Sequence, residues 1–184
     1  LSALDLEAIK TGDVDRIIPI FVKNDVPAYI KDYILLTSRN IVRFVDRFFR
    51  MEKIESITDY EAAHCATQRI IGDYAFYTAF CGEEEGITKI ADGFASTSFT
   101  QEEIDDAFDT LDAANEFLNC NNGLFVTGLS NQGIDTTLES PIMKKTKTVI
   151  HAKEHMYRIP LFVEDQPVDL IICYDDSWSM QDGV

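Results

Sequence analysis

Three polar side chains that could do chemistry recur at close spacing in the segment LDAANEFLNCNNGLF, residues 111–125. They are Asp112, Glu116 and Asn119, separated by four and three residues. On a helix these intervals bring side chains to nearly one side, so two carboxylates and a carboxamide would project together. Such a set either acts on a molecule outside the protein or is a solvated helix face. Because acidic helix faces are commonly only solvated, the spacing alone favours the second interpretation.

The helix that must position these residues is predicted to run from about residue 101 to residue 132. Thr100 and Glu103 form a capping box, a helix start signal, and Gly133 suits the C-terminal end. At about 100° per residue, the three polar side chains lie off the centre of a single apolar arc. The residues of this arc are Ile104, Ala107, Phe108, Leu111, Ala114, Leu118, Phe125 and Leu129.

Two further carboxamides, Asn121 and Asn122, follow near the edges of the apolar arc. Small or apolar residues would suit a buried helix face better. Either these two side chains are hydrogen-bonded in a partly buried position, or the helix is irregular there.

A second long helix is predicted over residues 26–50, after one or two short helices in residues 1–25. Pro27 suits its first turn. Apolar residues recur along it with a helical period. They are Val26, Ile30, Ile34, Ile41, Val45 and Phe48.

A basic row of Arg39, Arg43 and Arg47 lies on another face of this second helix, with Arg50 near it. It is the one basic stripe in an acidic sequence. The row either pairs with the chain's own carboxylates, which we favour, or docks an acidic partner.

Strands are predicted in the remaining segments. AFYTAFCG and ITKIADGFAS, within residues 60–98, have the pattern of a β-hairpin around the acidic turn GEEEG. After residue 133, β-rich segments are separated by turns at Pro141, AKEH and EDQP, and the tail DSWSMQDGV is predicted to be frayed. This segregated order predicts an α+β fold, with two long helices packed on an antiparallel β-sheet and extra N-terminal helices.

The composition of the 184 residues is that of a soluble globular domain, with 46% hydrophobic and 26% charged residues. The net charge of −16 repels phosphate backbones and anionic lipid, so we expect no nucleic-acid and no membrane partner. The start has no signal-peptide pattern, so we expect a cytoplasmic protein. The cysteines form no C-x-x-C pair and are predicted to be free buried thiols. They are Cys65, Cys81, Cys120 and Cys173.

The segment HAKEH places His151 and His155 four residues apart, a spacing that could bind zinc on a helix. It lies between two predicted strands, where this spacing does not bring side chains together, so we interpret it as a hairpin turn. No P-loop or dinucleotide-binding fingerprint occurs. The sequence therefore predicts no metal site and no cofactor site of its own.

The motif DAANEFLN, that is Asp112-x-x-x-Glu116-x-x-Asn119, with Pro141 downstream, resembles the signature of the CheC/CheX chemotaxis phosphatases. The resemblance extends over about residues 26–176, where the predicted elements follow the family's order. It implies a helical extension or linker over 1–25, a CheX-like domain over 26–176 and a flexible tail over 177–184. The other long helix has no Glu-x-x-Asn pair, so a single-site, CheX-like arrangement is implied.

The resemblance implies a phosphatase (a hydrolase) acting on the aspartyl phosphate of CheY-type response regulators in chemotaxis and two-component signalling. Glu116 would grip the partner's active-site lysine, and Asn119 would orient a water in line with phosphorus. A carboxamide suits this role, because its oxygen accepts a hydrogen bond from water without adding a full charge. Asp112 would support the helix face or the docking. The Mg²⁺ would come from the response regulator, and two chains would pair into a homodimer through sheet edges.

A second hypothesis is a non-catalytic dimerisation or docking module. In this reading the chain is the output domain of a longer response-regulator protein, which fits a sequence that starts with Leu1. The presence of both Glu116 and Asn119 favours the phosphatase. Joint exposure of these two side chains on an accessible helix surface would discriminate between the hypotheses.

Overall fold

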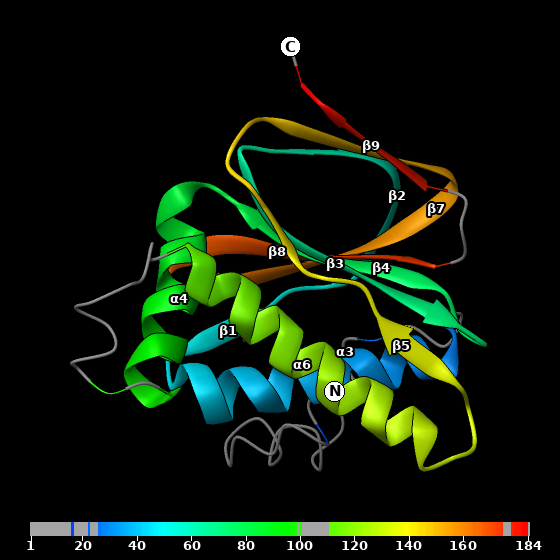
Figure 1. Cartoon of the computed structure of the whole chain (residues 1–184). Helices are drawn as coiled ribbons and strands as arrows, with labels where there is room; N and C mark the ends of the chain where they lie inside the picture. Colours follow the sequence, from blue (N-terminus) through cyan, green and yellow to red (C-terminus); the bar gives the residue numbers. More distant parts are fainter. Residues whose placement is uncertain are drawn as a thin grey trace.

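The computed structural model describes residues 16, 22, 26–98, 100, 111–174 and 178–183. Over these residues the chain forms a nine-stranded antiparallel sheet that curls, with three α-helices gathered at one side of it (Figure 1). The α+β class with an antiparallel sheet is as predicted. The predicted helical extension over 1–25 lies outside the described residues, apart from Arg16 and Val22.

The sheet has the strand order β1-β7-β8-β4-β3-β5, with β2 and β9 paired to β7 and β6 paired to β3. Every one of these pairs is antiparallel. The strands are β1 Phe49–Met51, β2 Glu55–Ala62, β3 His64–Gly72, β4 Phe76–Gly82, β5 Thr136–Leu138, β6 Ile142–Lys144, β7 Thr148–Val163, β8 Gln166–Tyr174 and β9 Trp178–Asp182.

Strand β7 is one long strand, and it runs through the segment AKEH, so the predicted hairpin turn there is wrong. The physical reason is the alternation of Ile150, Ala152 and Met156, which bury one face of the strand between the two curled halves of the sheet. A register shift in β2 between Ile57 and Asp59 accommodates the bend.

The segment that contains ITKIADGFAS is helix α4, Glu84–Ser98, and not the second strand of a hairpin. Its buried positions are spaced for a helix, namely Ile87, Ile90, Ala91 and Phe94. Gly86 and Gly93 let the helix approach other backbone closely. A Cβ on Gly86 would lie 2.4 Å from the Pro167 carbonyl oxygen, and one on Gly93 would lie 2.4 Å from the Val45 carbonyl oxygen. The hairpin partner of β4 is β3.

The N-terminal long helix is shorter than predicted. Helix α3, Ala28–Asn40, continues into a π-helical turn η1, Ile41–Val45, and ends at Asp46, whose φ is 49°. Asp is among the residues that tolerate this left-handed conformation. Five of the six predicted apolar positions are buried, whereas Phe48 lies beyond the helix end and is exposed.

Helix α6, Asp112–Ser130, carries the polar motif and ends before Gly133, which has a φ of 80°. Its predicted start, with Glu103 of the capping box, lies outside the described residues. At the other end of the chain, the described part of the predicted tail is strand β9, where Trp178 stacks on Tyr77 with ring centroids 4.1 Å apart.

The described residues form two hydrophobic cores, one on each face of the curled sheet. The larger one lies between the sheet and the helices, and the smaller one lies inside the curl of the strands. Cys65, Cys81 and Cys173 belong to the smaller core, as free buried thiols. Cys120 is exposed on α6, so the prediction of burial is wrong for this cysteine.

Candidate functional site on helix α6

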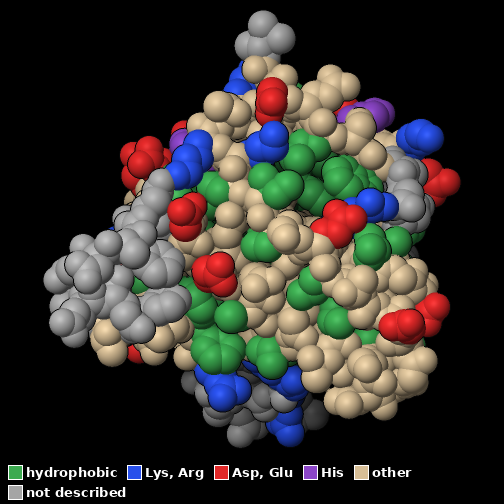
Figure 2. All heavy atoms as spheres, viewed as in Figure 1, with side chains coloured by type: hydrophobic (Ala, Val, Ile, Leu, Met, Phe, Trp, Pro, Cys, Tyr) green, Lys and Arg blue, Asp and Glu red, His purple; other side chains and the backbone are tan. Residues whose placement is uncertain are grey.

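The predicted polar residues share the outward side of α6. Asp112 and Glu116 are exposed and Asn119 is half-buried, whereas the neighbouring Phe117 and Leu118 are fully buried. Figure 2 shows acidic side chains over the first turns of this helix, beside hydrophobic side chains. The joint accessibility of Glu116 and Asn119, required for action on another molecule, is therefore present.

Asn119 is held from below by a buried glutamine of strand β3. The Gln68 Nε2 atom donates to Asn119 Oδ1 at 2.8 Å and to the carbonyl oxygen of Glu139 at 2.9 Å. Gln68 is only 2% exposed. Glu139 lies two residues before Pro141 in the connection between β5 and β6, so this connection is also hydrogen-bonded to Gln68. Pro141 itself is half-buried.

Asn122 forms the next step behind Gln68 and is completely buried. Its Nδ2 atom donates to Gln68 Oε1 at 2.8 Å and to Thr78 Oγ1 at 2.9 Å, while its Oδ1 accepts from the Tyr33 hydroxyl at 2.6 Å. Burial raises the pKa of Tyr33 to about 12, so its hydroxyl is protonated and able to donate at neutral pH.

Asn121 extends the same network to helix α3. Its Nδ2 atom donates to Thr37 Oγ1 at 3.0 Å and to the Tyr33 hydroxyl at 3.1 Å, and its Oδ1 accepts from Asn40 Nδ2 at 2.8 Å. Of the two alternatives for Asn121 and Asn122, the structure selects hydrogen-bonded burial. Burial is complete where the sequence predicts it to be partial. A continuous network of amides and hydroxyls therefore joins α3, α6, β3 and β4 beneath Asn119.

The predicted basic row is divided between two surroundings. Arg39 and Arg43 are exposed on α3 and η1, with the Arg43 guanidinium 4.9 Å from the centre of the Phe44 ring. Arg47 pairs with Glu164, with Nε 3.7 Å from Oε1. This pairing agrees with the favoured interpretation for Arg47.

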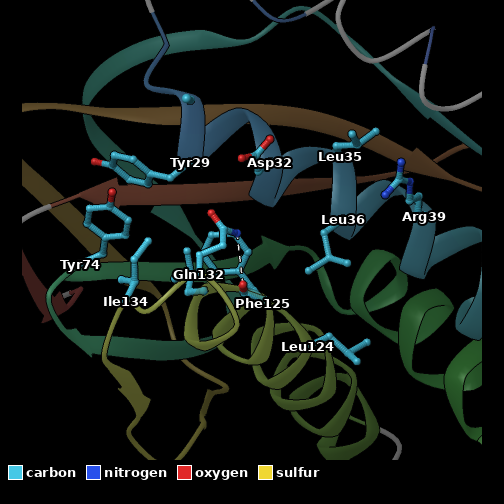
Figure 3. A pocket seen from close by; sticks show the side chains of 13 residues that line it. Tyr29, Asp32, Leu35, Leu36, Arg39, Tyr74, Leu124, Phe125, Gln132 and Ile134 are labelled. Atoms are coloured by element: carbon cyan, nitrogen blue, oxygen red, sulfur yellow. Dashed lines mark hydrogen bonds between the residues drawn. The ribbon is translucent and has the colours of Figure 1, made fainter.

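A surface hollow of about 420 Å³ lies between α3 and the C-terminal half of α6. Figure 3 shows Tyr29 and Tyr74 at one end of it and Arg39 at the other, with Leu36 and Leu124 along its sides. Leu124 is one of the exposed large hydrophobic residues and follows Asn119 on α6 by five positions. Neither the hollow nor Gln68 was predicted from the sequence.

Other chemistry at α6 is limited. The pKa of the Cys120 thiol is raised, first by its partial burial and then by the charge of Glu116, so it stays protonated at neutral pH and is a poor nucleophile. Among the residues that the structure describes, no three His, Cys, Asp or Glu side chains are grouped to hold a metal ion. His151 of the HAKEH segment instead faces Asp59, with Nδ1 2.7 Å from Oδ1.

The arrangement of Glu116 and Asn119 is suited to adding a carboxylate and a carboxamide to a site on another molecule. An exposed carboxylate can bind a cation, and a carboxamide with a fixed orientation can position a polar group or a water. Both lie on the outward side of α6, so a group on which they act would belong to another molecule. No helix within the described part of the chain is long and apolar enough to cross a bilayer.

Comparisons with solved structures identify the fold. The chain is similar to the chemotaxis protein CheX from Desulfovibrio desulfuricans, with a TM-score of 0.64 and 15% identity over 81% of this chain and 100% of that one. It is equally similar to a CheC-like superfamily protein from Shewanella sp. PV-4, with a TM-score of 0.64 and 16% identity over 82% and 99% of the two chains. The fold is therefore that of the CheX/CheC-like chemotaxis proteins.

A third similar structure is the CheX–CheY–BeF₃–Mg²⁺ complex from Borrelia burgdorferi, with a TM-score of 0.52 and 14% identity over 80% of this chain and 98% of that one. No family model matches the sequence, and no curated protein sequence matches it. At these identities the likeness establishes the fold, and the function must be argued from the site.

Proposed function

We propose that this chain hydrolyses the aspartyl phosphate of a CheY-type response regulator in chemotaxis or a related two-component system. The observation that carries the proposal is the joint accessibility of Glu116 and Asn119 on one side of α6, with Asn119 anchored by Gln68. The CheX/CheC-like fold supports it, as does the similarity to a CheX that was crystallised with CheY.

Glu116 binds the partner's active-site lysine. Its exposed carboxylate offers a charge-assisted hydrogen bond to an ammonium group, which fixes the register of the two proteins. Asp112, one turn earlier and also exposed, adds to the same acidic side. Arg39 and Arg43 supply the local positive charge that docking to an acidic receiver pocket needs, because the net charge of −16 gives no long-range attraction.

Asn119 enters the receiver's pocket and orients the attacking water. The water oxygen bonds to phosphorus, the bond from phosphorus to the aspartyl oxygen breaks, and the aspartate leaves as a carboxylate. The proton of the water passes to the phosphate product. Asn119 Oδ1 has two lone pairs, and Gln68 uses one of them, so the second accepts the hydrogen bond from the water. Such positioning without covalent chemistry is sufficient for phosphoryl transfer.

The Mg²⁺ that neutralises the phosphoryl oxygens belongs to the receiver in this proposal, and the present chain contributes no cofactor. The protein acts in the cytoplasm, where response regulators are phosphorylated. Two copies pair through sheet edges into a homodimer, with the α6 surface of each copy left accessible to a receiver.

The test is the decay of a phosphorylated CheY-type receiver with and without the protein, beside Glu116→Ala and Asn119→Ala. We expect the parent to accelerate decay, Asn119→Ala to lower the rate by about 100-fold or more, and Glu116→Ala to weaken docking. Failure of the parent to accelerate decay of any of several receivers from the same source would overturn the proposal.

A non-catalytic docking module is the second candidate. The observation in its favour is the hollow between α3 and α6, with the exposed Leu124 at its side. In this case the receiver would bind at α6 with measurable affinity, while its phosphate would decay at the same rate as in buffer.

A further inference from the structure

Gln68 occupies a position from which it controls the orientation of Asn119. It lies on β3, beneath α6, and its side chain makes hydrogen bonds on three sides, to Asn119, to Asn122 and to the backbone carbonyl of Glu139. The bond between Gln68 and Asn122 is buried, and the bonds to Asn119 and to Glu139 are partly buried, since Gln68 itself is only 2% exposed.

The backbone carbonyl of Glu139 fixes the direction of this hydrogen-bond network. A carbonyl oxygen is only an acceptor, so Gln68 must turn its Nε2 toward it, 2.9 Å away. The second hydrogen of Nε2 then points to Asn119, which must present its oxygen. Gln68 Oε1 consequently faces Asn122 Nδ2. A flip of either the Gln68 or the Asn122 amide would bring two donors or two acceptors together.

The network continues in one direction to helix α3. Asn40 donates to Asn121, Asn121 to the Tyr33 hydroxyl, and the Tyr33 hydroxyl to Asn122. Asn122 donates to Gln68, and Gln68 to Asn119. In such a chain each donor polarises the next, which strengthens the bonds together. The chain starts in the core and ends at the half-buried Asn119, the proposed water-orienting group.

We infer that Gln68 is a positioning residue of this site, which holds the Asn119 carboxamide through one lone pair of Oδ1 and fixes its rotamer before a partner binds, with the second lone pair left for the water. This inference rests on the proposed function for its catalytic consequence. Its structural content, the restraint of one side chain by another, can be measured without any partner.

The test compares Gln68→Met with Thr67→Val in the full chain. Met keeps the length of the side chain and removes its donors and its acceptor. Thr67 is the adjacent residue on β3, is also 2% exposed, and donates to the carbonyl oxygen of Ile142 at 3.1 Å, so Thr67→Val removes one strand-to-connection hydrogen bond without touching Asn119.

One readout is the side-chain amide of Asn119 in ¹⁵N NMR spectra, assigned by the signals that Asn119→Ala lacks. We expect a rigid amide in the parent and in Thr67→Val, and a mobile, shifted amide in Gln68→Met. The second readout is turnover of a phosphorylated receiver, for which we expect kcat to fall by about 10- to 100-fold in Gln68→Met with KM within about twofold, because Glu116 is untouched. Thr67→Val should keep both constants.

An Asn119 amide as rigid in Gln68→Met as in the parent, or a parent-like kcat in that variant, would overturn the inference while the phosphatase proposal stood. A parent without activity would overturn the phosphatase proposal, and the NMR comparison would still decide whether Gln68 restrains Asn119. If Gln68→Met does not fold, Gln68→Asn takes its place in both measurements. It keeps a carboxamide that is one methylene too short to reach both Glu139 and Asn119.

Discussion

The two faces of the curled sheet bury polar groups in different ways. On the face toward the helices, Gln68, Asn121 and Asn122 are neutral amides that form a directed chain ending at the surface. Inside the curl, the Tyr60 hydroxyl donates to Asp169 Oδ2 at 2.7 Å, and Arg158 Nε lies 2.9 Å from the same oxygen.

This difference distinguishes a network that orients a functional side chain from a cluster that only stabilises the sheet. An amide both donates and accepts, so a row of amides can transmit a fixed orientation from the core to an exposed side chain without the desolvation penalty of a charge. The Asp169 carboxylate only accepts and is closed off by its two partners, so it ties strands β2, β7 and β8 together. Substitutions on the helix side should therefore change catalysis, whereas substitutions inside the curl should change stability alone.

The largest change in stability is expected from Asn122→Ala. It leaves the Tyr33 hydroxyl and Gln68 Oε1 without their buried partner, which costs about 3 kcal/mol of unfolding free energy in total. Urea unfolding measures this value, and turnover by the folded fraction should fall as well. A variant with parental turnover per folded molecule would show that the chain behind Gln68 has no part in the site.

A somewhat smaller change in the free energy of unfolding is expected from the ionisation of Tyr33 at alkaline pH. Burial raises the pKa of Tyr33 from 10.0 to about 12, so its stabilising contribution is complete below pH 10 and is lost as the pH rises through 12. Tyr33→Phe should be less stable than the parent at pH 8, and this difference should narrow by up to about 2.5 kcal/mol by pH 12. Unfolding curves at both pH values check this, and a constant difference would contradict the burial argument.

On the other face, Asp169→Asn should cost about 2 kcal/mol, because the hydrogen bond from Tyr60 and the pairing with Arg158 lose their charge. Receiver turnover, measured well below the unfolding midpoint, should stay within about twofold of the parent. A loss of turnover without a loss of stability would break the distinction between the two faces.

The smallest effect on stability and turnover is expected from Cys120→Ser. The thiol is exposed beside Asn119, but its raised pKa keeps it protonated at neutral pH. We expect a stability change below about 0.5 kcal/mol and unchanged turnover. A thiol-modification assay that abolishes activity in the parent and not in the variant would indicate only that a bulky group blocks docking.

Helix α6 and its polar side were predictable from the sequence because the signal is local. Apolar residues recur with a helical period, and Asp112, Glu116 and Asn119 lie off their arc. Asn121 and Asn122 were also recognisable in the sequence as unusual, because they are two carboxamides near the edges of the apolar arc. Their partners could not be predicted, since Gln68 and Tyr33 lie 54 and 89 residues away from Asn122 in the chain.

The two wrong predictions, a strand at α4 and a turn within β7, also arise from contacts between residues that are distant in sequence. The segment of α4 contains β-branched residues and glycines that favour a strand or a turn. Its helix instead buries Ile87, Ile90 and Phe94, and its glycines allow close approach to the Val45 and Pro167 carbonyls. In β7, the polar residues of AKEH suggest a turn, but Ala152 and Met156 bury against strands distant in sequence. Tertiary packing therefore determines the secondary structure of both segments, α4 and β7.

The measurement that tests the account most directly is the decay of a phosphorylated CheY-type receiver, recorded side by side for the parent, Asn119→Ala and Asp169→Asn. The account predicts rapid decay with the parent and with Asp169→Asn, and decay at close to the rate in buffer with Asn119→Ala. Equal decay with and without the parent, or equal acceleration by the parent and Asn119→Ala, would contradict it.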